Sequence, residues 1–203
     1  MNVNAPQGAR RRRRTPEEAQ GEIIAAAEAL LRERPFRELT VDEVMRRTEL
    51  SRPSFYVYFR DRHELVLRVV QHLFGALVVP SMQWFEDGRE EDLYAALHGV
   101  VQVYGEHSHV MRALADAAAD DVAVEAAYNQ LVTAFIDLTQ AKLEVEGAAG
   151  RADVPDPLQV ATAIVWMAER YLYLSFRADS PPPCDVIADV LHTVWVRTIY
   201  ARR

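Results

Sequence analysis

From Thr40 to Arg62 the chain reads TVDEVMRRTELSRPSFYVYFRDR, and this stretch predicts two short helices joined by a tight turn. Thr40 is followed three residues later by Glu43, a capping box that marks the start of the first helix. Ser51 occupies the cap position of the second helix, and Pro53 falls in its first turn, where no intrahelical N–H is needed. We therefore predict a helix-turn-helix unit in this part of the chain.

The second of these helices has one anchoring side and several polar sides. Phe55 and Phe59 are four residues apart, so they lie on the same side of the helix. The other sides carry polar and aromatic residues: Arg52, Ser54, Tyr56 and Tyr58. A short helix of this kind suits insertion into a DNA major groove. An ordinary helical hairpin, with its aromatics in a core and its arginines in solvent, is the alternative interpretation of the same pattern.

Two longer strings carry a family resemblance. SRPSFYVYFRDRHELVL, residues 51–67, resembles the recognition helix and the following helix of the TetR (tetracycline repressor) family. IIAAAEALLRERPFRELTVDEV, residues 23–44, resembles the first two helices of that family. The family usually has a glycine in the turn before the recognition helix, where this chain has Glu49.

The resemblance implies a homodimer that binds double-stranded operator DNA and responds to a small effector. It also implies that Arg62, at the start of the fourth helix, meets a backbone phosphate. Together with the helical pattern, it places the DNA-binding residues at Thr40, Ser51, Arg52, Ser54, Phe55, Tyr56, Tyr58 and Arg62.

The composition is that of a globular protein. The chain has 203 residues, of which 50% are hydrophobic and 26% are charged. We expect no apolar run long enough to span a membrane and no secretory signal, hence a cytoplasmic protein. The single cysteine, Cys184, excludes an intrachain disulfide and fits a reducing compartment.

Charge is distributed unevenly along the chain. The net charge of −7 at first argues against nucleic acid as a partner. Residues 1–68, however, carry 14 arginines against 11 acidic residues, whereas residues 69–203 carry 9 basic and 19 acidic residues. A basic head on an acidic body is the asymmetry expected of a DNA-binding protein. We predict a disordered basic arm over residues 1–14, a DNA-binding head over 15–62, and a ligand-binding and dimerisation body over 63–203.

Arg10 to Arg14 stand in a row within the arm. The arm either contacts phosphates or the minor groove beside the main helix, or is a solubilising tail.

Apolar residues at helical spacing continue through the body, with no convincing strand and no internal repeat. The predicted fold is all-α, with about nine helices. We expect the first helix from Pro16 to Pro35, the fourth from Asp61 to Pro80, the fifth from Leu93 to Tyr104, the sixth capped by Ser108, the seventh capped by Asp121, the eighth from Asp156 to about Phe176 and the ninth from about Asp185.

Motifs of catalysis are missing from the sequence, which predicts a protein that is not an enzyme and has no cofactor. His107 and His109 could bind a metal with Asp116 or Asp120, but a third fixed ligand is wanting, so we expect no metal. Glu169, with its neighbour Arg170, lies in an apolar helix and is either a polar group facing a ligand or part of an ion pair at the edge of the bundle.

Aromatic residues of the body suggest a ligand cavity. In the family member that the chain resembles most, aromatics line the pocket at the positions of Tyr94, Tyr104, Tyr128, Phe135 and Trp195. Two pocket asparagines of that relative are replaced here by Val165 and Ala168, so the polar anchor must come from elsewhere, such as the tyrosine hydroxyls. The predicted ligand-binding residues are Tyr94, Tyr104, Tyr128, Val132, Phe135, Val165, Trp166, Ala168 and Trp195.

The sequence as a whole predicts a ligand-responsive transcriptional repressor. It would bind a near-palindromic operator as a homodimer, pair through its last two helices, and release the DNA when a small, largely apolar effector binds. The alternative is a helical small-molecule-binding protein or enzyme with no DNA-binding role.

Overall fold

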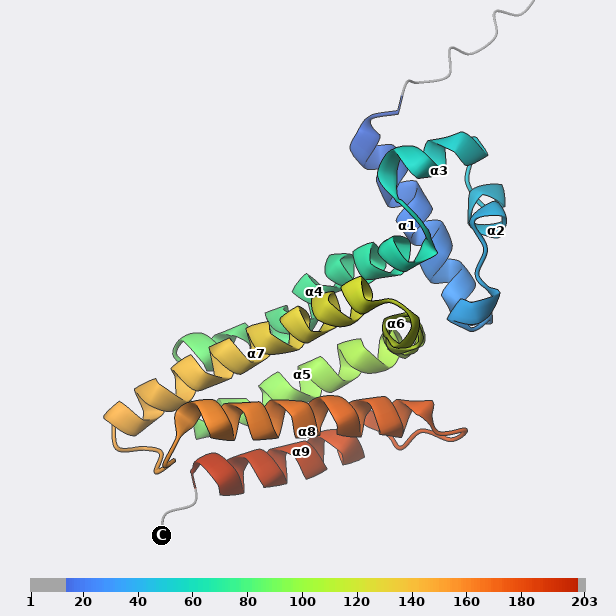
Figure 1. The fold of residues 1–203 in the computed structure, drawn as a ribbon. Helices are drawn as coiled ribbons and strands as arrows, with labels where there is room; N and C mark the ends of the chain where they lie inside the picture. The colour runs from blue at the N-terminus through green and yellow to red at the C-terminus, as the bar shows by residue number, and fades with distance from the viewer. Residues whose placement is uncertain (1–13, 201–203) are drawn as a thin grey trace, which may run out of the picture.

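The computed structural model describes residues 14–200, which form nine α-helices, two single-turn 3-10 helices and no strand (Figure 1). The all-α prediction is therefore confirmed. Residues 1–13 of the predicted arm lie outside the described residues. The α-helices are α1 (Pro16–Glu33), α2 (Val41–Arg46), α3 (Arg52–Tyr58), α4 (Arg62–Glu86), α5 (Leu93–Glu106), α6 (Ser108–Asp120), α7 (Val122–Ala148), α8 (Pro157–Arg177) and α9 (Cys184–Ile199); the 3-10 turns are η1 (Phe36–Glu38) and η2 (Glu90–Asp92).

The head consists of α1, η1, α2 and α3, which stand at one end of the longer body (Figure 1). Thr15 and Glu18 form a complete capping box at the start of α1, because each side chain accepts the other residue's backbone N–H. The core of the head is built from buried side chains of every element, among them Ile23, Leu30, Phe36, Val44, Phe55 and Phe59.

Helix α4 leaves the head and runs along the body, with Asp61 as its N-cap (Figure 1). The prediction that this helix ends at Pro80 is wrong, since the helix continues through the proline to Glu86. A proline inside a helix removes one hydrogen bond and crowds the preceding turn, yet packing can hold the helix together. The packing partner is Gly99 of α5: a Cβ placed there would lie 2.4 Å from the Pro80 Cβ.

The expectation that no apolar run could span a membrane also needs correction. Among the described residues, α4 is long and apolar enough by length and composition, with a mean hydropathy of 1.6 over its most apolar window. The core helix of a folded domain passes the same test. Packing of α4 against α1, α5, α6 and α7 accounts for its apolar character here.

Helices α5 to α9 complete the body, with α6 at the end next to the head and α8 beside α9 on the side away from it (Figure 1). His107, rather than Ser108, occupies the N-cap position of α6, so that predicted cap is wrong. Asp121 caps α7 as predicted by accepting the N–H groups of Ala123 and Val124.

A buried polar cluster holds the far end of α7 to the connection after α4. The Lys142 ammonium donates to the Gly88 carbonyl oxygen at 2.5 Å and lies 3.1 Å from a Glu146 carboxylate oxygen. Arg151 binds both oxygens of that carboxylate, at 2.8 and 2.9 Å. These hydrogen bonds, that of Arg151 first, hold the pKa of Glu146 below its usual value.

Candidate nucleic-acid interface and internal cavity

The turn between α2 and α3 forms without a glycine. No described residue other than glycine has a positive φ, so Glu49 occupies this turn without left-handed backbone strain. Its N–H donates to a Glu22 carboxylate oxygen of α1 at 2.7 Å, and Arg14 reaches both carboxylates, at 2.6 Å to Glu49 and 3.1 Å to Glu22. The departure from the usual family residue is thus accommodated by contacts to α1.

Caps at the two helix starts differ in detail from the prediction. Thr40 Oγ1 accepts the Glu43 N–H, but its hydroxyl also donates to the Glu43 carboxylate, so only half of the capping box forms. Ser51 sits at the N-cap of α3, yet its hydroxyl pairs with that of Ser54 at 2.9 Å and not with a backbone N–H. Both hydroxyls lie at the exposed edge of the head.

Helix α3 divides into the two sides that the sequence predicts. Phe55 and Phe59 are buried in the head, at 0% and 1% exposure. Phe55 therefore holds the helix in place and does not itself reach DNA, which corrects its inclusion among the DNA-binding residues. Arg52 and Tyr56 are exposed, while Ser54 and Tyr58 are half-buried. Sequence reasoning missed Val57, which is 75% exposed on the same helix and has no polar group to mark it.

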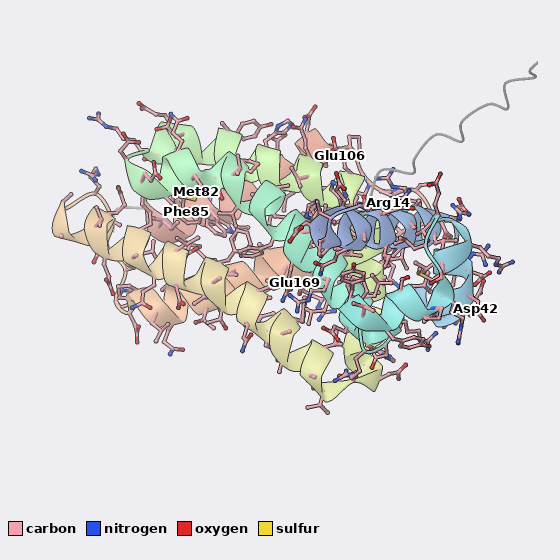
Figure 2. The ribbon with its side chains drawn as sticks, turned by 90° about the horizontal axis from the view of Figure 1, so that it is seen from above. Arg14, Asp42, Met82, Phe85, Glu106 and Glu169 are labelled. Carbon is pink, nitrogen blue, oxygen red and sulfur yellow. The ribbon has the colours of Figure 1, made fainter. Side chains whose placement is uncertain are left out.

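Arg52 is not free in solution but pairs with Asp42 of α2. Its Nε donates to the Asp42 carboxylate, and its guanidinium lies 5.7 Å from the centre of the Tyr56 ring. Figure 2 shows Asp42 at the outer edge of the head, far from the body. Both partners of the ion pair are more than half exposed, so the pair is weak and can be separated by a competing anion.

Arg62, which was predicted to contact a DNA phosphate, donates to backbone carbonyl oxygens of the head in this structure. Its Nη1 donates to the carbonyl oxygens of Arg37 and Leu39, at 3.1 and 3.2 Å, and its guanidinium stacks on Phe36 at 4.7 Å. These contacts fix η1 against the start of α4, so in this structure Arg62 joins head to body.

An apolar cavity of about 140 Å³ lies inside the body. Helices α4 to α9 all contribute to its walls. Seven of the predicted ligand-binding residues line it: Tyr104, Tyr128, Val132, Phe135, Val165, Ala168 and Trp195. Tyr94 does not line it, because it stacks on His98 and packs against His192 of α9. Trp166 is also outside the lining and lies behind Tyr128, with their ring centres 6.3 Å apart.

The polar anchor of the cavity is a tyrosine–carboxylate pair. The Tyr128 hydroxyl donates to Glu169 Oε1, and Glu169 Oε2 is buried without a hydrogen-bond partner. Figure 2 shows Glu169 within the outline of the body, toward the end that carries the head. Burial, followed by the bond to Glu169, raises the pKa of Tyr128 well above its ordinary value, so the hydroxyl keeps its proton. Of the two interpretations of Glu169, the one facing the cavity agrees with the structure, although Arg170 also approaches it at 3.7 Å.

Sequence reasoning missed the wall that α4 contributes, namely Val70, Phe74, Leu77, Ser81, Trp84 and Phe85. The signal was available, because the apolar spacing of the helix continues past Pro80 to Trp84. Ending the helix at the proline removed half of this wall from consideration. The helix that leaves the head is therefore also a wall of the cavity.

A helix-turn-helix head on a helical body with an internal apolar cavity defines a class of protein: the DNA-binding regulator that senses a small molecule. Comparisons agree with this class. Residues 23–69 match the family described as bacterial regulatory proteins, tetR family, and residues 93–201 match the C-terminal domain of the transcriptional regulator EthR. The chain belongs to the TetR family, and it is a DNA-binding, ligand-responsive transcriptional repressor of the EthR type.

The relatives show which members it resembles. It is 31% identical over 205 residues to the HTH-type transcriptional regulator EthR of Mycobacterium tuberculosis, covering 98% of this chain and 94% of that protein. EthR of Mycolicibacterium smegmatis is 26% identical over 98% of this chain and 94% of its own length. EthR, the ethionamide-resistance repressor, is the family member whose pocket positions were compared with this sequence above, and that likeness is thereby confirmed. The alternative without a DNA-binding role is wrong.

Solved structures agree in fold. FadR from Bacillus subtilis, in complex with stearoyl-CoA, matches with a TM-score of 0.74 at 11% identity, covering 88% of this chain and 98% of that one. A TetR-family regulator from Syntrophomonas wolfei also has a TM-score of 0.74 at 11% identity, covering 90% and 95%.

Proposed function

We propose that this repressor binds a near-palindromic operator as a cytoplasmic homodimer and leaves it when an effector enters the body cavity. One observation carries the proposal: α4 begins at the helix-turn-helix head and, further along, forms a wall of the cavity. A displacement of that wall tilts the helix and changes the position of the head. Binding of a small molecule is thereby coupled to DNA recognition.

Recognition of DNA is assigned to the exposed side of α3. Arg52, Ser54, Tyr56 and Tyr58 face the major groove, and the exposed Val57 packs on a thymine methyl group. Arg52 exchanges Asp42 for a base or a phosphate when the complex forms. Arg52→Ala should weaken operator binding by about 1–3 kcal/mol if the side chain reads a base. Equal affinity of wild type and variant for every promoter fragment would contradict the assignment.

Dimerisation is assigned to α8 and α9. Their outer sides expose Leu158, Leu174, Val186, Val190 and Val194, each between 38% and 56% exposed. Apolar side chains in such a row on two adjacent helices favour a four-helix bundle with a symmetry-related copy. Leu191, next to Val190 on α9, is buried at 1% exposure and lines the cavity, so a substitution there does not test the interface.

The effector is a largely apolar molecule with one hydrogen-bond donor. Apolar walls bind its hydrophobic part, and its donor meets Glu169 Oε2, which accepts no hydrogen bond from the described residues and has the Arg170 guanidinium 3.7 Å away. A cavity of 140 Å³ holds a molecule about the size of benzene, whereas drug-sized ligands need roughly 300 Å³ or more. A larger effector must therefore push the walls apart. FadR from Bacillus subtilis, which has a similar fold, was solved in complex with the long-chain ligand stearoyl-CoA.

Tryptophan fluorescence tests the coupling, because Trp84 and Trp195 line the cavity. Candidate effectors are titrated with and without operator DNA, on wild type, on Phe135→Ala in the cavity and on Tyr94→Phe outside it. A coupling of about 1–3 kcal/mol predicts that effector weakens operator binding about 5- to 150-fold, and that operator weakens effector binding by the same factor. Tight effector binding that ignores operator would show that the cavity is not a sensor.

A further inference from the structure

A cluster of metal-binding side chain types lies outside the cavity, where the head meets the body. Glu28 of α1 faces His107 and His109 at the joint between α5 and α6. The Glu28 Oε1 atom lies 3.2 Å from His107 Nδ1 and 4.0 Å from His109 Nε2, and the three ligand atoms all lie within 4.8 Å of one another. We propose that Glu28, His107 and His109 bind a divalent transition-metal ion such as Zn²⁺ and so tie the head to the body.

The geometry is close to that of a metal site. Zn²⁺ holds nitrogen and oxygen ligands at about 2.0–2.1 Å, which places tetrahedral ligand atoms roughly 3.4 Å apart. The contact between Glu28 and His107 already has this separation; the Glu28–His109 pair must close by about 0.6 Å and the His107–His109 pair by at most about 1.4 Å. Rotation of the side chains supplies such a movement. Two imidazoles and one carboxylate suit Zn²⁺, Ni²⁺ or Co²⁺, with water in the fourth position.

The surroundings favour binding by side chains that are already held in place. The three ligands are largely buried, with side-chain exposures of 18% for Glu28, 18% for His107 and 9% for His109. His109 Nε2 accepts a hydrogen bond from Arg32, so this ring nitrogen carries no proton, as metal binding requires. Asp116 and Asp120, the ligands that the sequence suggested beside these histidines, are exposed on α6 and not part of the cluster.

Arg32 occupies the place of the cation in the present arrangement. Its Nη2 donates to Glu28 Oε1 at 2.8 Å, and its Nε donates to His109 Nε2 at 3.3 Å. The Arg32 side chain is 58% exposed, so it can turn into solvent at little cost when an ion enters. The guanidinium and the metal therefore compete for the same two ligands.

A second cluster, Asp61, His63 and Asp121, has similar residue types but its carboxylates are already engaged. Asp61 Oδ1 accepts the N–H groups at the start of α4, and Asp121 Oδ1 does the same at α7. Arg60 approaches the remaining oxygen of each, at 2.7 and 3.5 Å. This cluster is therefore the matched control.

The experiment titrates the untagged full-length chain with Co²⁺, whose visible absorption reports four-coordinate binding, and then displaces it with Zn²⁺. We expect one ion per chain. Glu28→Gln and His107→Asn should weaken binding at least about tenfold, whereas His63→Asn should leave it unchanged. The Asn side chain in His107→Asn keeps an N–H that can donate to Glu28. The metal-free variant should therefore be as stable as wild type, and a loss of metal binding then reports a lost ligand and not a damaged fold.

Arg32→Ala gives the sharpest outcome. Removal of the guanidinium that competes for Glu28 and His109 should tighten metal binding severalfold, a gain that a damaged fold cannot produce. In wild type, metal should also raise the melting temperature, and this rise should disappear in Glu28→Gln. Absence of stoichiometric Co²⁺ or Zn²⁺ binding, binding that survives His107→Asn, or binding lost in His63→Asn would each overturn the proposal.

Discussion

Replacement of Gly99 by alanine tests whether the close approach of α4 and α5 holds the long helix together across its proline. The new Cβ would lie 2.4 Å from the Pro80 Cβ and 3.3 Å from its Cγ, so the two helices must move apart. Gly75, which lies in α4 together with Pro80, is the control, because a Cβ added there would meet nothing within 4 Å. Both glycines are helical, so their intrinsic gain on conversion to alanine is the same.

The sizes of two opposing effects decide whether each substitution stabilises or destabilises the protein. Alanine is favoured over glycine by about 1 kcal/mol in a helix interior, and overpacking costs about 1–3 kcal/mol in a close-packed contact. Gly75→Ala should therefore stabilise the protein by about 1 kcal/mol, whereas Gly99→Ala should be neutral or destabilising by up to about 2 kcal/mol. The difference of about 1–3 kcal/mol corresponds to a gap of about 2–12 °C in melting temperature for a chain of this size.

Urea and thermal unfolding, followed by circular dichroism at one protein concentration, measure both variants. The same substitution is also made in a Pro80→Gly variant, which separates the clash from other causes. The proline ring is absent there, so Gly99→Ala should become stabilising. Gly99→Ala that is as stabilising as Gly75→Ala, or that has the same effect with and without Pro80, would refute the packing argument.

Four further results are expected. Asp42→Asn should tighten operator binding by up to about fivefold in fluorescence anisotropy at fixed salt, since an exposed ion pair is worth at most about 1 kcal/mol; weaker binding would mean that Asp42 itself supports the complex. Val190→Glu should convert the dimer to a monomer in sedimentation, whereas a wild type that is monomeric at micromolar concentration would exclude the α8–α9 interface. Lys142→Met should destabilise the fold by about 3 kcal/mol in urea, the low end for a broken buried pair, because Arg151 remains on Glu146. The bond from Arg151 holds the pKa of Glu146 below its ordinary value, so its stabilising contribution is complete at pH 7 and is lost as the pH falls through that depressed pKa. Glu146→Gln should therefore differ more from wild type at pH 7 than in acid, as urea unfolding measures.

Local patterns explain what could be predicted from the sequence. The caps at Thr15, Asp61 and Asp121 act within one turn of the chain, so they are legible in the sequence and present in the structure. The buried and exposed sides of α3 could also be predicted, because the spacing of residues within this seven-residue helix is enough to place Phe55 and Arg52 on different sides.

Contacts between distant segments explain what was missed. Pro80 normally ends a helix, and only its packing on Gly99 shows why α4 continues. The half of the α4 wall that follows Pro80 was missed together with that part of the helix. Glu28 could not be predicted as a neighbour of His107 and His109, because 79 residues separate it from His107 in the sequence.

The ion pair between Arg52 and Asp42 has a consequence for how the repressor searches a genome. Away from its operator, the protein meets an excess of unrelated sequences, all of which offer phosphates. On each of them Arg52 must give up Asp42 in return for a contact of similar strength, so nothing is gained. In the proposed complex, the exchange favours DNA where a guanine accepts both of the Arg52 donors. Because separating the pair costs the same at every site, the carboxylate lowers the affinity for random DNA as well as for the operator, and so shortens the time that the repressor spends on random DNA.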